Sequence, residues 1–399
     1  MSLDLGAVGR QIAHLGEVLV DRREGEEDRL RRALSLLDSA ADVDLLAAKI
    51  ARSRTAWRPA LPVEPLTIRC RPVDPPTEFS VLASDGSTIE PDRHGSALCY
   101  LINIGLVALH YGARPQAALY SVPSLGFRDE DLYVQAGEQQ ILVAGPLLSI
   151  RRQTLESERL AALAESVPSE RVSVALQDGT LILGTLEGSG LERWLQAQRV
   201  LKPLLDNYSR FRALGVPLAA YASRPRHGDV VNALRVLACP EPQPDCQKGC
   251  RFQAQPTPPG GETCRALARL SDRVLFRSIL SPRERSAVFL SQWPISVDNY
   301  GEHKVHFFYL HAGPEIARVE VPEWVARDKT LVDLVHAAVV DQCERGRGYP
   351  TALLEAHEQA VLRAADRRQF ESIVEAALVR AGLPTTTSEK ERGKRLRAL

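Results

Sequence analysis

Two aspartates in the sequence follow apolar runs and precede the same kinds of small residue. Asp85 begins Asp-Gly-Ser after the run 79–83, and Asp178 begins Asp-Gly-Thr after the run 171–177. Because strand ends converge at one edge of a sheet, we expect the two carboxylates to lie close together. Crowded carboxylates repel one another unless a divalent cation lies between them, and Mg²⁺ and Mn²⁺ prefer such oxygen ligands. The pattern favours metal-assisted phosphodiester cleavage, and the alternative is that each Asp-Gly pair only forms a turn.

The segments around the aspartates alternate between strand and helix patterns. Apolar runs of strand length occur at 79–83, 97–109, 115–123, 171–177 and 216–223. Helical patterns occur at 149–167 and 191–214. The Ser-Asp-Gly-Ser sequence at 84–87 predicts a tight turn between the first two strands. An antiparallel start followed by parallel crossovers predicts an α/β fold, with an RNase H-like mixed sheet flanked by helices.

Three other regions flank or interrupt this pattern. An N-terminal helical segment and linker is expected over 1–76, because helical spacing gives way to scattered prolines. The main domain is expected over 77–382, with its last helices at 329–344 and 351–382. A loop insertion rich in Pro, Gly and Cys interrupts it at about 239–264, and 383–399 form a charged tail.

Composition limits the class of protein. Lys and Arg total 50 and Asp and Glu total 50, so the net charge is zero, which argues against strong independent nucleic-acid binding. The N-terminus lacks a signal-peptide core, and the longest apolar stretch, 97–109, is too short to span a membrane. We therefore expect a cytoplasmic protein without a membrane partner. The odd number of cysteines, seven, argues against a disulfide framework.

Four motifs, in their order and spacing, resemble the NurA family of DNA nucleases. They are LASDGS at 82–87, LQDGTLIL at 176–183, FFYL and IARVEVPEW within 307–324, and YPTALLEAHEQAV at 349–361. The resemblance implies a deoxyribonuclease that uses Mn²⁺ or Mg²⁺, with two ions, and in which Asp85 and Asp178 match the metal-binding aspartates. It also implies a homodimer that works with a HerA-type hexameric ATPase, a DNA translocase, in DNA end resection and repair.

The resemblance assigns three further site positions. It places a glutamate on the helix before Asp178, and Glu156 and Glu158 are the candidates. Helical spacing puts Glu156 on an apolar face, so we choose it as the catalytic metal ligand; the alternative is that both are surface charges. Tyr349 matches a position that orients phosphate or water. His357 matches one that ligates metal or transfers a proton, although a histidine on such a face is alternatively a packed core residue.

The loop insertion contains a group of cysteines that suggests a second, structural metal site. Four thiols in such a loop can hold Zn²⁺ or an iron–sulfur cluster, although their spacing includes no CxxC pair. The alternative is four reduced thiols at the surface. The residues are Cys239, Cys246, Cys250 and Cys264.

Clustered arginines are candidates for contact with DNA phosphates. Arg151, Arg152 and Arg224 are expected near strand ends or helix starts, where such contacts form; the alternative is a solvated face. Arg318 and Glu320 alternate along one expected strand, and we assign them no role because exposed ion pairs of this kind are common.

Two rival functions remain compatible with these residues. One is a catalytically weak adaptor that binds DNA or a translocase, which the zero net charge favours. The other is an RNA-directed nuclease of the same fold, because a carboxylate cluster does not distinguish DNA from RNA.

Overall fold

The computed structural model describes residues 4–39, 42–55, 57–93, 95–136, 138–183, 201–247 and 264–383. The chain divides into two compact units, each made of separate stretches. The first unit comprises Met1–Pro72, Ala222–Val297 and His306–Val319, and the second comprises Val73–Tyr221, Asp298–Val305 and Glu320–Leu399.

The second unit is built on a mixed sheet with the strand order β5-β4-β3-β8-β9. The first three strands pair antiparallel, whereas β3 pairs parallel with β8, and β8 pairs parallel with β9. This arrangement confirms the expected α/β fold with an RNase H-like mixed sheet. The strands are β3 (Phe79–Ile89), β4 (Tyr100–Tyr111), β5 (Gln116–Gly126), β8 (Ser173–Asp178) and β9 (Leu218–Ala222).

The tight turn expected at 84–87 is wrong, because β3 continues through these residues. Asp85 lies opposite Gly105 of β4, and Ser87 lies opposite Asn103. The apolar run of β4 is long enough to satisfy the backbone of β3 along its whole length. Pairing between β3 and β8 ends at Ser84. Asp85 therefore lies where β3 still pairs with β4 but no longer pairs with β8.

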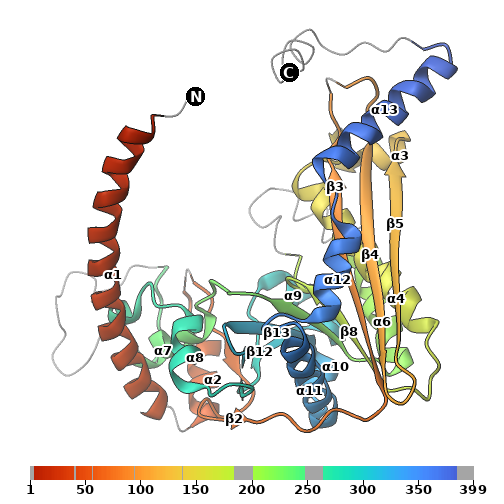
Figure 1. Ribbon diagram of the computed structural model, residues 1–399. Helices are drawn as coiled ribbons and strands as arrows, with labels where there is room; N and C mark the ends of the chain where they lie inside the picture. Colours follow the sequence, from red (N-terminus) through yellow and green to blue (C-terminus); the bar gives the residue numbers. More distant parts are fainter. Residues whose placement is uncertain are drawn as a thin grey trace. The chain divides into compact units, whose positions relative to one another are not determined.

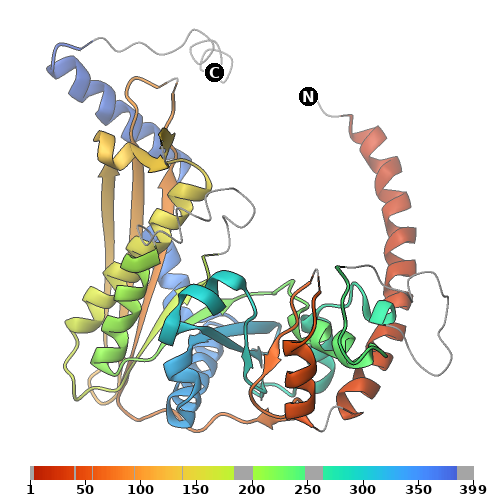
Figure 2. The same ribbon diagram turned by 180° about the vertical axis from the view of Figure 1, so that it is seen from behind.

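Helices cover both faces of this sheet (Figure 1, Figure 2). Helices α4 (Pro146–Glu165) and α6 (Leu201–Leu214) lie behind the strands in Figure 1, and α12 (Thr351–Ala360) lies in front of them. The late helix expected over 351–382 is interrupted, since α13 begins again at Ala364 (Ala364–Arg380). The other elements that lie wholly in this unit are α3 (Asp129–Leu132), β6 (Tyr133–Ala136), β7 (Gln139–Leu142), η2 (Gly301–His303), α10 (Glu323–Ala326) and α11 (Lys329–Arg345).

The first unit has its own hydrophobic core, which includes Leu37, Leu234 and Phe289. Strand β11 pairs antiparallel with both β1 and β12, and β10 pairs with β2 and β12. Its helices are α1 (Leu5–Ser39), α2 (Val43–Ala51), α7 (Asp229–Ala238), η1 (Cys264–Leu267) and α8 (Asp272–Ile279). Its strands are β1 (Leu61–Pro62), β2 (Arg69–Cys70), β10 (Arg285–Ser286) and β11 (Phe289–Leu290). Unit boundaries fall within β9, α9 (Pro294–Asn299), β12 (Val305–His311) and β13 (Ile316–Pro322).

Within the described ranges, no helix is both long enough and apolar enough to cross a membrane.

Candidate active site

The expected strand end at Asp178 is present, and the loop after it is firmly held. Strand β8 ends at Asp178, and Gly179 adopts a φ of 90°, a conformation that favours glycine. The carboxylate of Glu320 then accepts hydrogen bonds from the Thr180 hydroxyl at 2.6 Å and from the Leu181 backbone N–H at 3.0 Å. Glu320, for which no role is predicted from the sequence, is thus a buried anchor for this loop.

Tyr349 contacts Asp178 directly. Its hydroxyl donates a hydrogen bond to Asp178 Oδ1 at 2.7 Å. Its ring packs edge-on against Tyr221 of β9, with the ring centroids 5.4 Å apart. Packing against β9, the strand next to β8, therefore fixes the position of the Tyr349 hydroxyl beside Asp178.

His357 lies against the other aspartate. The distance from His357 Nδ1 to Asp85 Oδ2 is 2.7 Å, and the imidazole is largely exposed. Helix α12 carries His357 and is tied to the sheet by Asn103, whose Nδ2 donates to the Ala360 carbonyl at 3.0 Å. Gly105 allows the close approach, because a Cβ there would lie 2.0 Å from the Ala356 carbonyl oxygen.

Glu156 reaches the aspartates from the opposite face of the sheet. Its side chain is 5% exposed, and a Cβ on Gly86 would lie 2.5 Å from Glu156 Oε1. Gly86 is thus the opening in β3 that admits this side chain. Burial raises the pKa of Glu156 to about 8; Arg152 opposes the shift, and the nearby charges of Asp85 and Asp178 add to it.

Asp85, Glu156 and Asp178 therefore form one carboxylate cluster. Partial burial raises the pKa of Asp178 as well, and the charge of Asp85 adds to this, although the Tyr349 hydrogen bond acts against it. Mutual repulsion of this kind shows that the carboxylates lie within each other's fields. A cation beside them lowers the energy of the ionised forms, and Arg152 supplies one through its contact with Glu156.

The chemistry of this donor set fits a hard divalent cation, because three carboxylates and an imidazole supply oxygen-rich ligands. In the described part of the chain, however, no three His, Cys, Asp or Glu side chains are placed to hold a metal ion as they stand. Arg152, Tyr349 and His357 contact the carboxylate oxygens of this donor set.

Replacement of Glu156 by Gln is expected to reduce the pH dependence of stability. The unfolded side chain loses its proton near its ordinary pKa of 4.5, whereas the folded one keeps it until about 8. Between these values the folded chain holds a proton that the unfolded chain has released. The free energy of unfolding of the parent therefore falls as pH rises, by up to ~1.4 kcal/mol per pH unit. Urea unfolding of the metal-free parent and Glu156→Gln across this range tests this, and identical pH dependence would contradict it.

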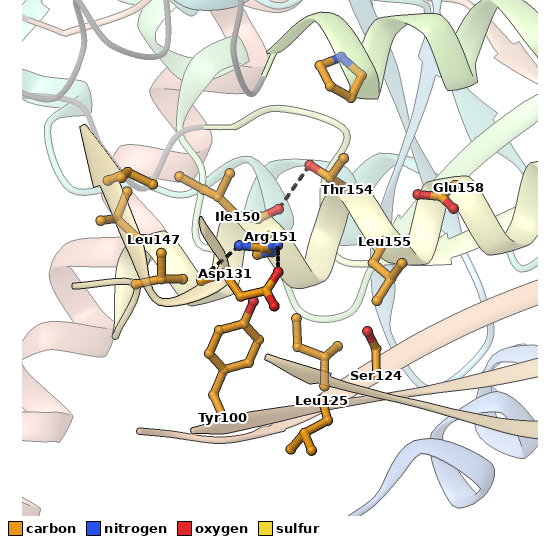
Figure 3. A pocket seen from close by; sticks show the side chains of 14 residues that line it. Tyr100, Ser124, Leu125, Asp131, Leu147, Ile150, Arg151, Thr154, Leu155 and Glu158 are labelled. Atoms are coloured by element: carbon orange, nitrogen blue, oxygen red, sulfur yellow. Dashed lines mark hydrogen bonds and ion pairs between the residues drawn. The ribbon is translucent and has the colours of Figure 1, made fainter. Parts of the chain in front are cut away.

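The remaining sequence candidates lie elsewhere. Glu158 is exposed and lines a cavity of about 410 Å³ together with Arg151 (Figure 3). Arg151 Nη2 contacts Asp131 Oδ1 at 3.0 Å and so faces away from Glu156. Arg224 belongs to the first unit, where its Nε lies 3.6 Å from Glu315 Oε2.

The cysteine site stays a prediction. Cys239, Cys246 and Cys264 carry thiols that form no disulfide, and the last two lie close enough to Arg235 to affect its pKa, which burial lowers and their charges raise. Cys250 lies outside the described residues.

Comparison with known proteins identifies a family for this chain. The profile of the NurA domain family matches residues 79–362. A search of curated proteins found no match.

Two solved structures are similar to parts of the chain. One is the native protease–reverse transcriptase of prototype foamy virus, with 16% identity and a TM-score of 0.22, over 37% of this chain and 18% of that one. The other is LC9-RNase H1, a type 1 RNase H with the type 2 active-site motif, with 14% identity and a TM-score of 0.20, over 40% of this chain and 71% of that one. These TM-scores are too low to carry an argument, so the fold assignment rests on strand order and direction.

The mixed sheet, with carboxylates gathered at the end of its parallel pair, places the protein in the RNase H-like class. The family profile covers more than half of the 399 residues and includes the whole carboxylate cluster. The chain belongs to the NurA family, a family of nucleases.

Proposed function

We propose that the protein is a metal-dependent deoxyribonuclease, with Mn²⁺ as its preferred ion. The observation that carries this proposal is the carboxylate cluster, which three separate elements build. Asp85 comes from β3, Asp178 from the end of β8, and Glu156 from α4 across the opening at Gly86. Carboxylates gathered in this way repel one another unless one is protonated or a cation offsets their charge, and their oxygens are the ligands that hard divalent cations prefer.

The cluster and His357 are the groups that would hold the ions. Divalent cations bound there would supply an acidified water and charge stabilisation for the leaving oxygen. Because Asp178 is anchored by Tyr349, one of these ligands is already restrained. Restrained ligands require little reorganisation when an ion binds.

His357 is oriented for a role in proton transfer or metal binding. An ionised Asp85 can only accept a hydrogen bond, so the Nδ1 of His357 carries the proton in their contact. The Nε2 atom then remains an acceptor, able to take a proton from water or to bind a metal. The exposed position of the imidazole allows it to reach a substrate phosphate.

We infer the DNA substrate and the partner from family membership. In this proposal the protein is a homodimer that processes DNA ends for repair together with a HerA-type hexameric ATPase, in the cytoplasm. The zero net charge is consistent with a nuclease to which the partner delivers DNA.

The proposal is tested by giving the purified protein single- and double-stranded DNA and matched RNA. We expect cleavage of DNA with added Mn²⁺, loss of cleavage on chelation with EDTA, and recovery when excess Mn²⁺ is restored. The double variant Asp85→Asn/Asp178→Asn controls for contaminating nuclease. Cleavage of RNA alone would instead indicate an RNA-directed enzyme.

Failure of the parent to cut any substrate, with or without a HerA-type partner, would favour an adaptor role and contradict the proposal.

A further inference from the structure

Arg152 lies inside the carboxylate cluster rather than at the surface of α4. Its Nη1 donates a hydrogen bond to Glu156 Oε1 and another to the Gly86 carbonyl at 3.0 Å. Its side chain is 31% exposed, and its charge also acts on Asp178. The guanidinium is therefore a cation shared by the cluster.

Strand β3 leaves space at Gly86 for the ion pair of Arg152 and Glu156. A Cβ on Gly86 would lie 2.9 Å from Arg152 Cγ and 2.5 Å from Glu156 Oε1. Both side chains of the ion pair thus depend on the missing side chain of Gly86. Because Arg152 and Glu156 are four residues apart on α4, they share one face of the helix.

A guanidinium and a divalent ion compete for the same lone pairs. The Oε1 atom of Glu156 already accepts a charge-assisted hydrogen bond, which is among the stronger kinds in proteins. When Glu156 is ionised, loss of Arg152 would leave its buried charge uncompensated, so Arg152 leaves the ionised Glu156 readily only when another cation replaces it.

We propose that Arg152 is the resident counter-cation of the cluster, which holds Glu156 through Oε1 in the metal-free state and must be displaced before that oxygen binds metal. The inference rests on the proposed function, since it describes how the same site is loaded. Arg152 then sets a threshold for metal binding, because part of the binding free energy is spent on breaking its contact with Glu156.

The test is calorimetric titration of the metal-free full chain with Mn²⁺. For the ionised form of Glu156, Arg152→Gln is expected to bind Mn²⁺ more tightly than the parent, with a Kd lower by about tenfold, because the competing cation is gone. Arg151→Gln is the matched control. It removes the neighbouring arginine, which points from another face of α4 and contacts Asp131 of α3 (Figure 3). The Kd of this variant for Mn²⁺ is expected to equal that of the parent.

Thermal unfolding in EDTA gives a second readout that does not depend on metal. Where Glu156 is ionised, Arg152→Gln is expected to lower the Tm, because the carboxylate loses its counter-cation. Arg152→Gln/Glu156→Gln is expected to recover part of this loss, because the buried charge is removed as well. If Arg152→Gln does not fold, Arg152→Lys serves instead. It keeps the charge but loses the Nη1 donor that reaches both Glu156 and Gly86, so it is expected to bind Mn²⁺ with intermediate affinity.

The outcomes separate this inference from the proposed function. Equal or weaker Mn²⁺ binding by Arg152→Gln, beside a parent that binds Mn²⁺ and cuts DNA, overturns the role of Arg152 alone. Absence of Mn²⁺ binding in both proteins overturns the inference and the metal-dependent function together.

Discussion

Asp178→Asn is expected to lower Mn²⁺-dependent DNA cleavage about 1000-fold, which corresponds to ~4 kcal/mol of lost transition-state stabilisation. Asp178 ends β8 beside an exposed surface, and its carboxylate is fixed by Tyr349 and by the loop that Glu320 anchors. An amide has almost the same shape but no charge, so it weakens metal binding. Initial rates of cleavage of a labelled DNA duplex measure the effect.

The amide oxygen still accepts the hydrogen bond from Tyr349, so Asp178→Asn is expected to keep its fold, as circular dichroism will show. Asp206→Asn is the matched control. Asp206 lies on α6, where it is exposed and paired with Lys202, and its replacement is expected to leave cleavage unchanged. A rate for Asp178→Asn close to that of the parent would remove Asp178 from the site.

Gly105→Ala is expected to cost ~2–4 kcal/mol of stability and to lower cleavage about 100-fold. The new Cβ would lie 2.0 Å from the Ala356 carbonyl oxygen and 2.7 Å from the Ala360 backbone nitrogen. Both are main-chain atoms of α12, so no change of rotamer relieves the contact, and the whole helix must move away from β4. His357 moves with it and loses its contact with Asp85.

Urea unfolding and cleavage rates of the same preparation test this expectation. Gly9→Ala is the control, because Gly9 lies in helix α1 and has nothing within 4 Å of a built Cβ. Alanine there is expected to be neutral or slightly stabilising. If both variants behave alike, the close packing of α12 on the sheet does not position His357.

The two Asp-Gly pairs show how far the sequence predicts this fold. At Gly179 the glycine serves a turn with positive φ, as the sequence indicated. At Gly86 it serves close approach within a continuing strand, and the expected turn is absent. The two Asp-Gly pairs look alike in the local sequence. They differ in their surroundings in the fold: Gly86 lies against Glu156 from another element, whereas Gly179 follows the end of β8.

Part of the carboxylate cluster could be predicted from the sequence. The apolar face of the helix pointed to Glu156 instead of Glu158, and the structure places Glu156 beside the aspartates. The spacing of four residues between Arg152 and Glu156 was also a usable signal for an ion pair. Arg152 was expected to face DNA because it adjoins Arg151, yet adjacent helical residues point in different directions. Tyr349 and His357 were identified through the resemblance, because nothing in their local patterns indicates a catalytic role.

The opening at Gly86 has a consequence for the evolution of the family. Because that glycine makes room for both Arg152 and Glu156, positions 86 and 152 are constrained as a pair. A relative that carries a side chain at the first position is expected to carry a short residue at the second, and so to have lost the arginine. Such relatives would form a natural series in which metal affinity and residue choice at these two positions change together.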